Sequence, residues 1–174
     1  MAIRSALHLA HRFLSALRPG DEGAEESVWV LNTLLPGEQA LWRQMSGADR
    51  RHSSAVARRV ERALGPGASR PVLAAALLHD VGKIEADLGT WARVPATLVG
   101  LVVGRDRART WVDRPATLRR VGLYHAHAER GADLLAAAGS DHLTIAWARE
   151  HHLPPDRWTL DPIVAHALKD ADDD

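Results

Sequence analysis

The stretch Ala74–Lys83, AAALLHDVGK, restricts most strongly what this chain can fold into. Its apolar run predicts a buried helix, and that run ends abruptly in the adjacent residues His79 and Asp80. Burying an imidazole and a carboxylate next to apolar side chains costs several kcal/mol unless both groups find hydrogen-bond or charge partners. A divalent cation can serve as the partner of both. The sequence therefore indicates a metal site. The alternative is a helix C-terminus where the two side chains cap backbone or pair with each other.

Composition limits which residue types could hold a metal at such a site and which partners the protein could bind. The 174 residues include no cysteine, so a metal here is held by histidines and carboxylates, and the lack of disulfides fits a reducing cytoplasm. Lys plus Arg and Asp plus Glu both number 22, so the net charge of zero does not suggest a polyanion-binding surface. We therefore expect a cytoplasmic protein with a small molecule as its partner, and neither a nucleic-acid polymer nor a membrane.

Apolar residues recur at three- and four-residue spacing almost throughout, and Ala and Leu dominate, which predicts an all-α fold. Gly and Pro separate the periodic segments, Ser140 and Asp141 are typical helix N-caps, and the longest predicted helix is expected to break near Gly122. The first predicted helix is amphipathic and does not read as a signal peptide. The predicted helices cover residues 3–18, 25–34, 37–46, 50–64, 70–81, 94–103, 115–138, 140–151 and 161–171.

Residues 84–123 form a less regular stretch that is rich in Gly, Arg and Trp. An insertion at this place would cover a site, and Arg105, Arg107 and Arg109 would bind an anionic substrate there. The alternative is a solvated basic loop whose arginines pair with nearby aspartates.

Ten histidines are unevenly distributed, and five of them fall at or near predicted helix ends: His52, His79, His127, His151 and His152. Helix termini that face one pocket would bring such residues together. Taken in order with Asp80 and an aspartate of the terminal KDADDD, the series resembles the HD-domain superfamily of metal-dependent phosphohydrolases. The matching segments, from about residue 35 onward, are RHSSAVARRV, LLHDVGK, HAERGADLL, EHH and LKDAD.

The resemblance implies a compact single-domain helical bundle over residues 35–174, preceded by a helical extension over residues 1–34. It also implies divalent metal ligands. One ion would take His52, His79, Asp80 and Asp172, where Asp172 is preferred to Asp170 because the family closes with Ala-Asp. The alternative for the terminal aspartates is a frayed acidic tail.

A second ion is implied by His127 and one or both of His151 and His152, with Asp80 as the bridging ligand. We therefore expect two ions, and this donor set does not distinguish Fe, Mn, Mg, Co and Ni. Neighbouring His125 competes with His127, but the step from His127 to Gly131 favours His127. The remaining histidines receive no role: His8, His11, His142 and His166.

The resemblance assigns catalytic roles to Asp80 and Lys83. Lys83 would contact a substrate phosphate or orient the attacking hydroxide, and the alternative is a surface lysine. The implied function is a metal-dependent phosphohydrolase that acts on a phosphomonoester or phosphodiester, such as a nucleotide, through a metal-activated water. The implied partner is thus a small phosphorylated molecule. Two other functions stay open, a mixed-valent di-iron oxygenase and a non-catalytic nucleotide-binding domain.

Two departures limit the resemblance. The chain reads LPPDRW after His152, unlike the cyclic-di-GMP phosphodiesterase branch. Ala48 stands four residues before His52, where some of those enzymes carry a glutamate for a third metal, so we expect no third ion.

Overall fold

The computed structural model describes residues 23–173, and this part of the chain contains ten α-helices and no strand. The all-α prediction is confirmed, whereas the helix predicted over residues 3–18 lies outside the described residues. The α-helices are α2 (Ala24–Thr33), α3 (Pro36–Trp42), α4 (Gly47–Leu64), α5 (Arg70–Leu78), α6 (Thr90–Val103), α7 (Arg105–Arg109), α8 (Ala116–His125), α9 (His127–Ala137), α10 (His142–Glu150) and α11 (Pro162–Asp173). Short 3₁₀ helices are η1 (Gly65–Gly67), η2 (Val81–Ala86), η3 (Thr110–Asp113) and η4 (Pro155–Arg157).

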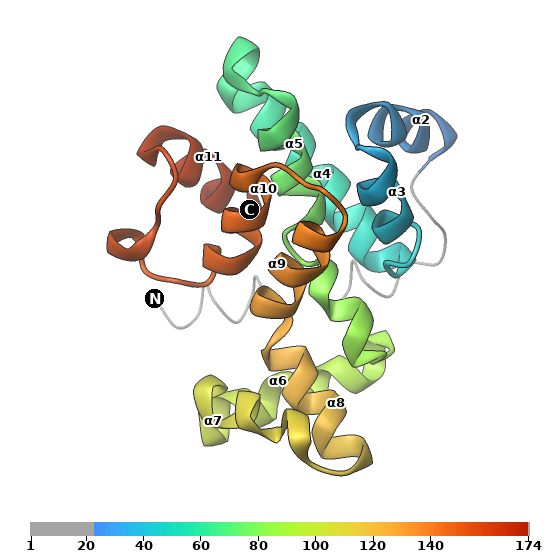
Figure 1. Ribbon diagram of the computed structural model, residues 1–174, viewed down its shortest axis with the longest axis vertical. Helices are drawn as coiled ribbons and strands as arrows, with labels where there is room; N and C mark the ends of the chain where they lie inside the picture. The colour runs from blue at the N-terminus through green and yellow to red at the C-terminus, as the bar shows by residue number, and fades with distance from the viewer. Residues whose placement is uncertain (1–22, 174) are drawn as a thin grey trace.

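Helix α5 lies at the centre of the bundle (Figure 1). Every residue from 72 to 78 is buried, which confirms the predicted buried helix. A helix that is apolar on all sides must be surrounded, and α2, α4, α10 and α11 all pack against it. The largest core side chains around α5 are Trp42, Trp147, Leu135 and Leu168.

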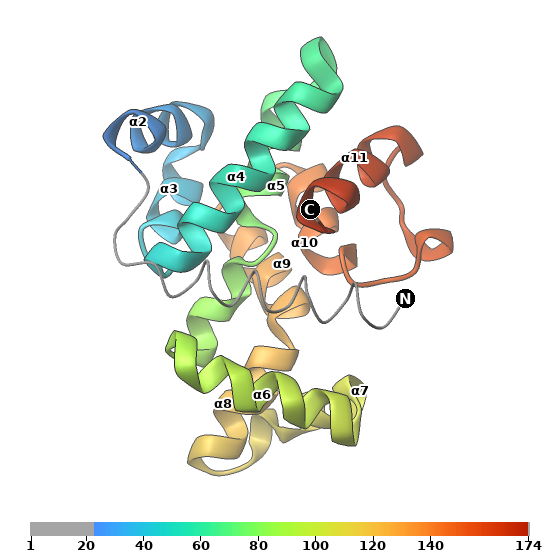
Figure 2. The ribbon, with the colours of Figure 1, turned by 180° about the vertical axis from the view of Figure 1, so that it is seen from behind.

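Helices α6, α7 and α8 form a lobe at one end of the long axis of the molecule (Figures 1 and 2). A small separate core holds this lobe together, made of Ala86, Leu88, Ala96 and Val121. The stretch predicted to be irregular is thus mostly helical. Gly104 lies between α6 and α7 at a φ of 88°. A glycine adopts this left-handed conformation without steric cost, so the chain can turn there.

Several predicted helix boundaries differ from the observed ones by three or four residues, and two differences lie next to the candidate ligands. The helix expected over residues 70–81 ends at Leu78, and η2 follows the turn at His79 and Asp80. The helix expected over residues 115–138 does break, as predicted, but at Ala126 and not near Gly122. Gly122 instead lies within α8, where a Cβ atom would come within 2.5 Å of the Val112 nitrogen, so this glycine permits close packing on η3.

The N-cap of α10 is Asp141, whose side chain accepts from the Leu143 backbone nitrogen at 3.0 Å. At the other end of the described chain, Val30 of α2 and Leu34, which follows this helix, belong to the main core. The division of the chain at residues 34 and 35 stays a prediction. Among residues 23–173, no helix has the length and apolar character needed to span a membrane.

Candidate metal centre

The same kind of hydrogen bond to the backbone orients three histidine rings. The Nδ1 atoms of His79, His127 and His151 each donate to the carbonyl oxygen three residues earlier, at 2.9, 2.6 and 2.9 Å. A carbonyl oxygen only accepts, so Nδ1 carries a proton in all three rings. The Nε2 atoms of these rings are therefore the atoms that can act as metal ligands. In metal-binding histidines the other ring nitrogen is commonly held by a hydrogen bond in the same way.

Asp80 lies between these rings and presents its two oxygens to different partners. Oδ1 is 3.3 Å from the Nε2 atom of His127 and 3.9 Å from that of His151. Oδ2 is 3.4 Å from the Nε2 atom of His79 and also accepts from the Lys83 ammonium. One carboxylate thus faces two separate histidine groups.

The histidines and Asp80 fall into two clusters that share Asp80. In each cluster one donor atom per residue lies within 4.8 Å of all the others. Asp172 joins the first cluster, because its Oδ1 atom is 2.9 Å from His52 Nε2 and 3.5 Å from His79 Nε2. The first cluster, here called cluster A, contains His52, His79, Asp80 and Asp172. The second, cluster B, contains Asp80, His127, His151 and His152.

The ends of helices bring these residues together. His79 and Asp80 follow the last residue of α5, His127 begins α9, and the His151-His152 pair follows α10. His52 comes from the first half of α4, and Asp172 from the last turn of α11. The structure thereby gathers the seven residues that the sequence marked as ligands, although they span most of the described chain.

Two ring nitrogens in the centre are buried and have no hydrogen-bond partner among the residues that the structure describes. They are the Nε2 atoms of His79 and His151, one from each cluster. A buried polar atom left unpaired costs about 1–3 kcal/mol. A divalent cation would satisfy both atoms, and imidazole nitrogen with carboxylate oxygen is a donor set that binds such cations. The residues present therefore fit a metal group.

Electrostatics in the centre favour a positive charge on the cluster A side. Burial opposes charge on His79, but Asp80 and Asp172 outweigh that penalty and raise its pKa to about 10. Burial and the neighbouring His79 lower the pKa of His151 to about 3. Burial also opposes ionisation of Asp80, yet Lys83 and His79 hold its pKa well below the ordinary value. A cation that binds here would replace the proton on His79.

The three arginines of the predicted anion site occupy different surroundings. Arg109 donates to the His125 carbonyl at 3.1 Å and to Glu129 at 2.7 Å, so its guanidinium is engaged. Arg105 is exposed, and its charge is among the influences, after burial and the neighbouring histidines, that lower the pKa of His152. Arg107 is exposed at the surface of α7. Among the three, Arg105 is thus the one whose charge reaches the cluster B side.

His125 is directed away from the centre. Its Nε2 atom donates to the Ala96 carbonyl at 2.8 Å, and the ring packs against Gly100 of α6. The sequence argument placed His125 and His127 on one helix. The structure instead separates them by the break at Ala126.

Sequence reasoning missed the close contact that positions His127. A Cβ atom on Gly82 would lie 2.0 Å from the His127 carbonyl oxygen and 2.6 Å from the Gly131 nitrogen. Two glycines thus let η2 and α9 touch through their backbones. The spacing Asp80-x-Gly82 and His127-x-x-x-Gly131 was the available signal, because both glycines stand at short, fixed distances from ligand candidates.

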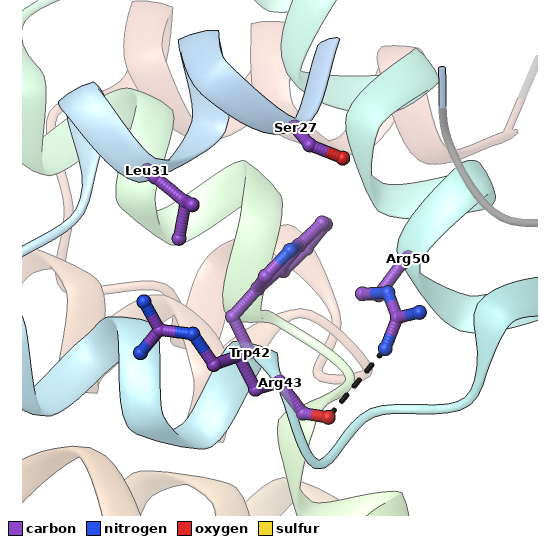
Figure 3. Close-up of a pocket in the computed structure, with 5 residues that line it drawn as sticks. All are labelled: Ser27, Leu31, Trp42, Arg43 and Arg50. Carbon is purple, nitrogen blue, oxygen red and sulfur yellow. Dashed lines mark hydrogen bonds between the residues drawn. The ribbon is translucent and has the colours of Figure 1, made fainter. Parts of the chain in front are cut away.

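A cavity of about 230 Å³ lies apart from the centre, between α2, α3 and α4 (Figure 3). Its lining contains none of the ligand candidates. Arg50 crosses one side and donates to the Arg43 carbonyl oxygen at 3.5 Å and to the Met45 carbonyl oxygen at 2.9 Å. The lining residues are Ser27, Leu31, Trp42, Arg43 and Arg50.

The fold and the centre define an all-α protein whose helix ends present a histidine and aspartate site for divalent metal. The HD domain family matches residues 51–173. The chain belongs to this family, which places it in the superfamily of metal-dependent phosphohydrolases. It matches no curated protein and no solved structure.

Proposed function

We propose that this protein is a dinuclear metal-dependent phosphohydrolase that acts on a small phosphomonoester or phosphodiester. The observation that carries the proposal is the position of Asp80, whose two oxygens face clusters A and B separately. A carboxylate between two nitrogen-rich clusters is the arrangement expected of a bridging ligand. Two orphaned Nε2 atoms, one in each cluster, support the same conclusion.

Each cluster would hold one cation. Divalent cations at such a centre supply an activated water at neutral pH and offset charge on phosphoryl oxygens. Lys83 is placed to act with them, because its ammonium contacts Asp80 and its side chain is only 13% exposed. That ammonium would hold Asp80 in its bridging orientation and donate to a phosphoryl oxygen of the substrate.

The number of bound ions tests the proposal directly. Loaded without oxygen with excess Mn²⁺ or Fe²⁺, the wild-type protein should bind two equivalents by elemental analysis. The double variant His127→Ala with His151→Ala should keep one, since it removes two of the four cluster B ligands. His142→Ala with His166→Ala is the matched control, because both residues are exposed and should leave two equivalents. Saturation of the wild type at one ion would contradict the dinuclear assignment.

The reaction itself is tested on the same samples. We expect phosphate release from generic aryl phosphates, with no O₂ consumed. An iron-loaded protein that consumes O₂ and releases no phosphate would instead support the oxygenase alternative. A protein that binds metal and does neither would support the non-catalytic alternative.

For the substrate we propose that Arg105 contacts its anionic group at the cluster B side. The support is its charge, which reaches His152, and its exposed position at the start of α7. Arg105→Glu should raise KM for a phosphorylated substrate by about tenfold with kcat and metal content little changed. Arg62→Glu, an exposed arginine on α4, is the control. Equal KM values in the two variants would remove Arg105 from the site.

A further inference from the structure

The outer face of α6 is apolar and uncovered among the described residues. Residues 94–103 read VPATLVGLVV and carry no charge. One face of this helix packs on the small core of the lobe through Ala96 and Val99. The opposite face exposes Val94, Leu98, Leu101 and Val102, of which Leu101 is 71% and Val102 84% exposed. A helix that is apolar on both faces requires a partner for the second face.

This face lies at an end of the molecule, not in a groove. Figure 2 shows α6 on the outside of the lobe, with the turn into α8 below it. Leu118, in the first turn of α8, is also 46% exposed. The lobe that carries this face thus lies at one end of the molecule, away from α5 at the centre of the bundle.

Exposed arginines lie in the segments that follow α6 within the same lobe. Arg93, Arg109 and Arg120 of the lobe are neutralised by carboxylates, namely Asp49, Glu129 and Asp87. Four other arginines, Arg105, Arg107, Arg114 and Arg119, are exposed, against two exposed aspartates, Asp106 and Asp113. Because the whole chain has zero net charge, this end is positive relative to the rest of the protein.

We propose that α6 and its flanking arginines form a docking surface for an anionic lipid membrane. An exposed apolar helix face in a lobe that also exposes arginines matches the chemistry of helices that lie in a membrane interface. The positive charge favours a membrane over a second copy of the chain, since a symmetric pair would bring the same arginines toward each other. From the overall composition we expected no membrane partner. The distribution of charge and apolar surface leads us to propose instead that the protein binds the surface of a membrane.

Co-sedimentation with lipid vesicles tests the proposal on the full chain. The protein should sediment with vesicles of phosphatidylcholine and phosphatidylglycerol, and much less with phosphatidylcholine alone. High salt should weaken the binding. The triple variant Leu98→Ser, Leu101→Ser and Val102→Ser should bind at least about tenfold more weakly. Its matched control is Val28→Ser with Ile163→Ser, because these residues are 59% and 72% exposed elsewhere.

Charge is tested separately with Arg107→Glu and Arg114→Glu, each expected to weaken binding by about fivefold or more. Arg62→Glu should have no effect. Circular dichroism should show an unchanged helical spectrum in every variant, because only exposed side chains change. A wild-type protein that ignores anionic vesicles would overturn the proposal. So would a wild-type dimer in sedimentation velocity that the serine variant converts to monomer without any vesicle binding, since the occupant would then be a second copy.

Discussion

At the scale of single residues, Asp80 balances most of the charge in the centre. It contacts the Lys83 ammonium and faces the Nε2 atoms of His79, His127 and His151. Asp80 is thus the shared partner of these four groups. The apolar packing of α5 ends at Leu78, before Asp80 begins.

We therefore predict that Asp80→Ala abolishes activity and lowers metal affinity by about a hundredfold or more, while most of the helix content remains. The helices are held mainly by apolar contacts, which this change leaves in place. Metal analysis after dialysis and far-ultraviolet circular dichroism measure the two effects. Asp113→Ala, at an exposed position, should change neither. Full metal occupancy in the Asp80 variant would show that the centre is assigned wrongly.

At the scale of elements, the contact between η2 and α9 sets the geometry of the centre. Gly82 touches the His127 carbonyl and Gly131 through backbone atoms alone. This contact fixes the distance between the turn that carries Asp80 and the helix that carries His127. Periodicity predicted both segments, but a helix-length pattern contains no information about how closely two backbones approach.

Gly82→Ala should therefore destabilise the protein by about 1–3 kcal/mol, because its Cβ atom would overlap backbone that cannot rotate away. The new methyl group should also push His127 away from Asp80 and reduce occupancy of cluster B. Urea unfolding and metal analysis test both effects. Gly67→Ala is the matched control, since the nearest atom to its Cβ would be 3.9 Å away. Similar stabilities of the two variants would contradict the packing argument.

At the scale of the whole molecule, a charged pair ties the lobe to the main bundle. Arg93 of α6 donates to both oxygens of Asp49 in α4, at 2.6 and 2.8 Å, and also to the Leu88 carbonyl. Burial opposes ionisation of Asp49, but Arg93 and Lys83 outweigh it and hold the pKa of Asp49 below its ordinary value. The ion pair therefore stabilises the folded state when Asp49 is charged.

Arg93→Ala should lower the free energy of unfolding at pH 7 by about 2–3 kcal/mol, because two hydrogen bonds to a charged, largely buried group are lost. A carboxylate with a depressed folded pKa contributes stability above its unfolded pKa of about 3.9 and loses it as the pH falls. The difference in the free energy of unfolding between the wild type and Asp49→Asn should thus shrink below about pH 4. Urea titrations at several pH values measure it, with Arg62→Ala as control. A difference that is constant down to acid pH would contradict the ion pair.

The sequence alone determined the all-α class and the ligand candidates. Three- and four-residue periodicity is local, so it can be recognised from the chain. The ligand candidates came from the resemblance of the ordered motifs around His52, His79, His127, His151 and Asp172 to the HD-domain superfamily. The buried position of α5 followed from its unbroken apolar run. These inferences depend on which residues follow one another, and the sequence contains that information completely.

Only the tertiary structure decided what depends on residues distant along the chain. The close approach of Gly82 to His127 and the engagement of Arg109 by Glu129 are contacts between separate elements. The apolar face of α6 that no described residue covers belongs to the same group, since the sequence of an apolar helix is the same whether or not a neighbour covers it. Solvent exposure and backbone approach are properties of packing, and local pattern does not encode them.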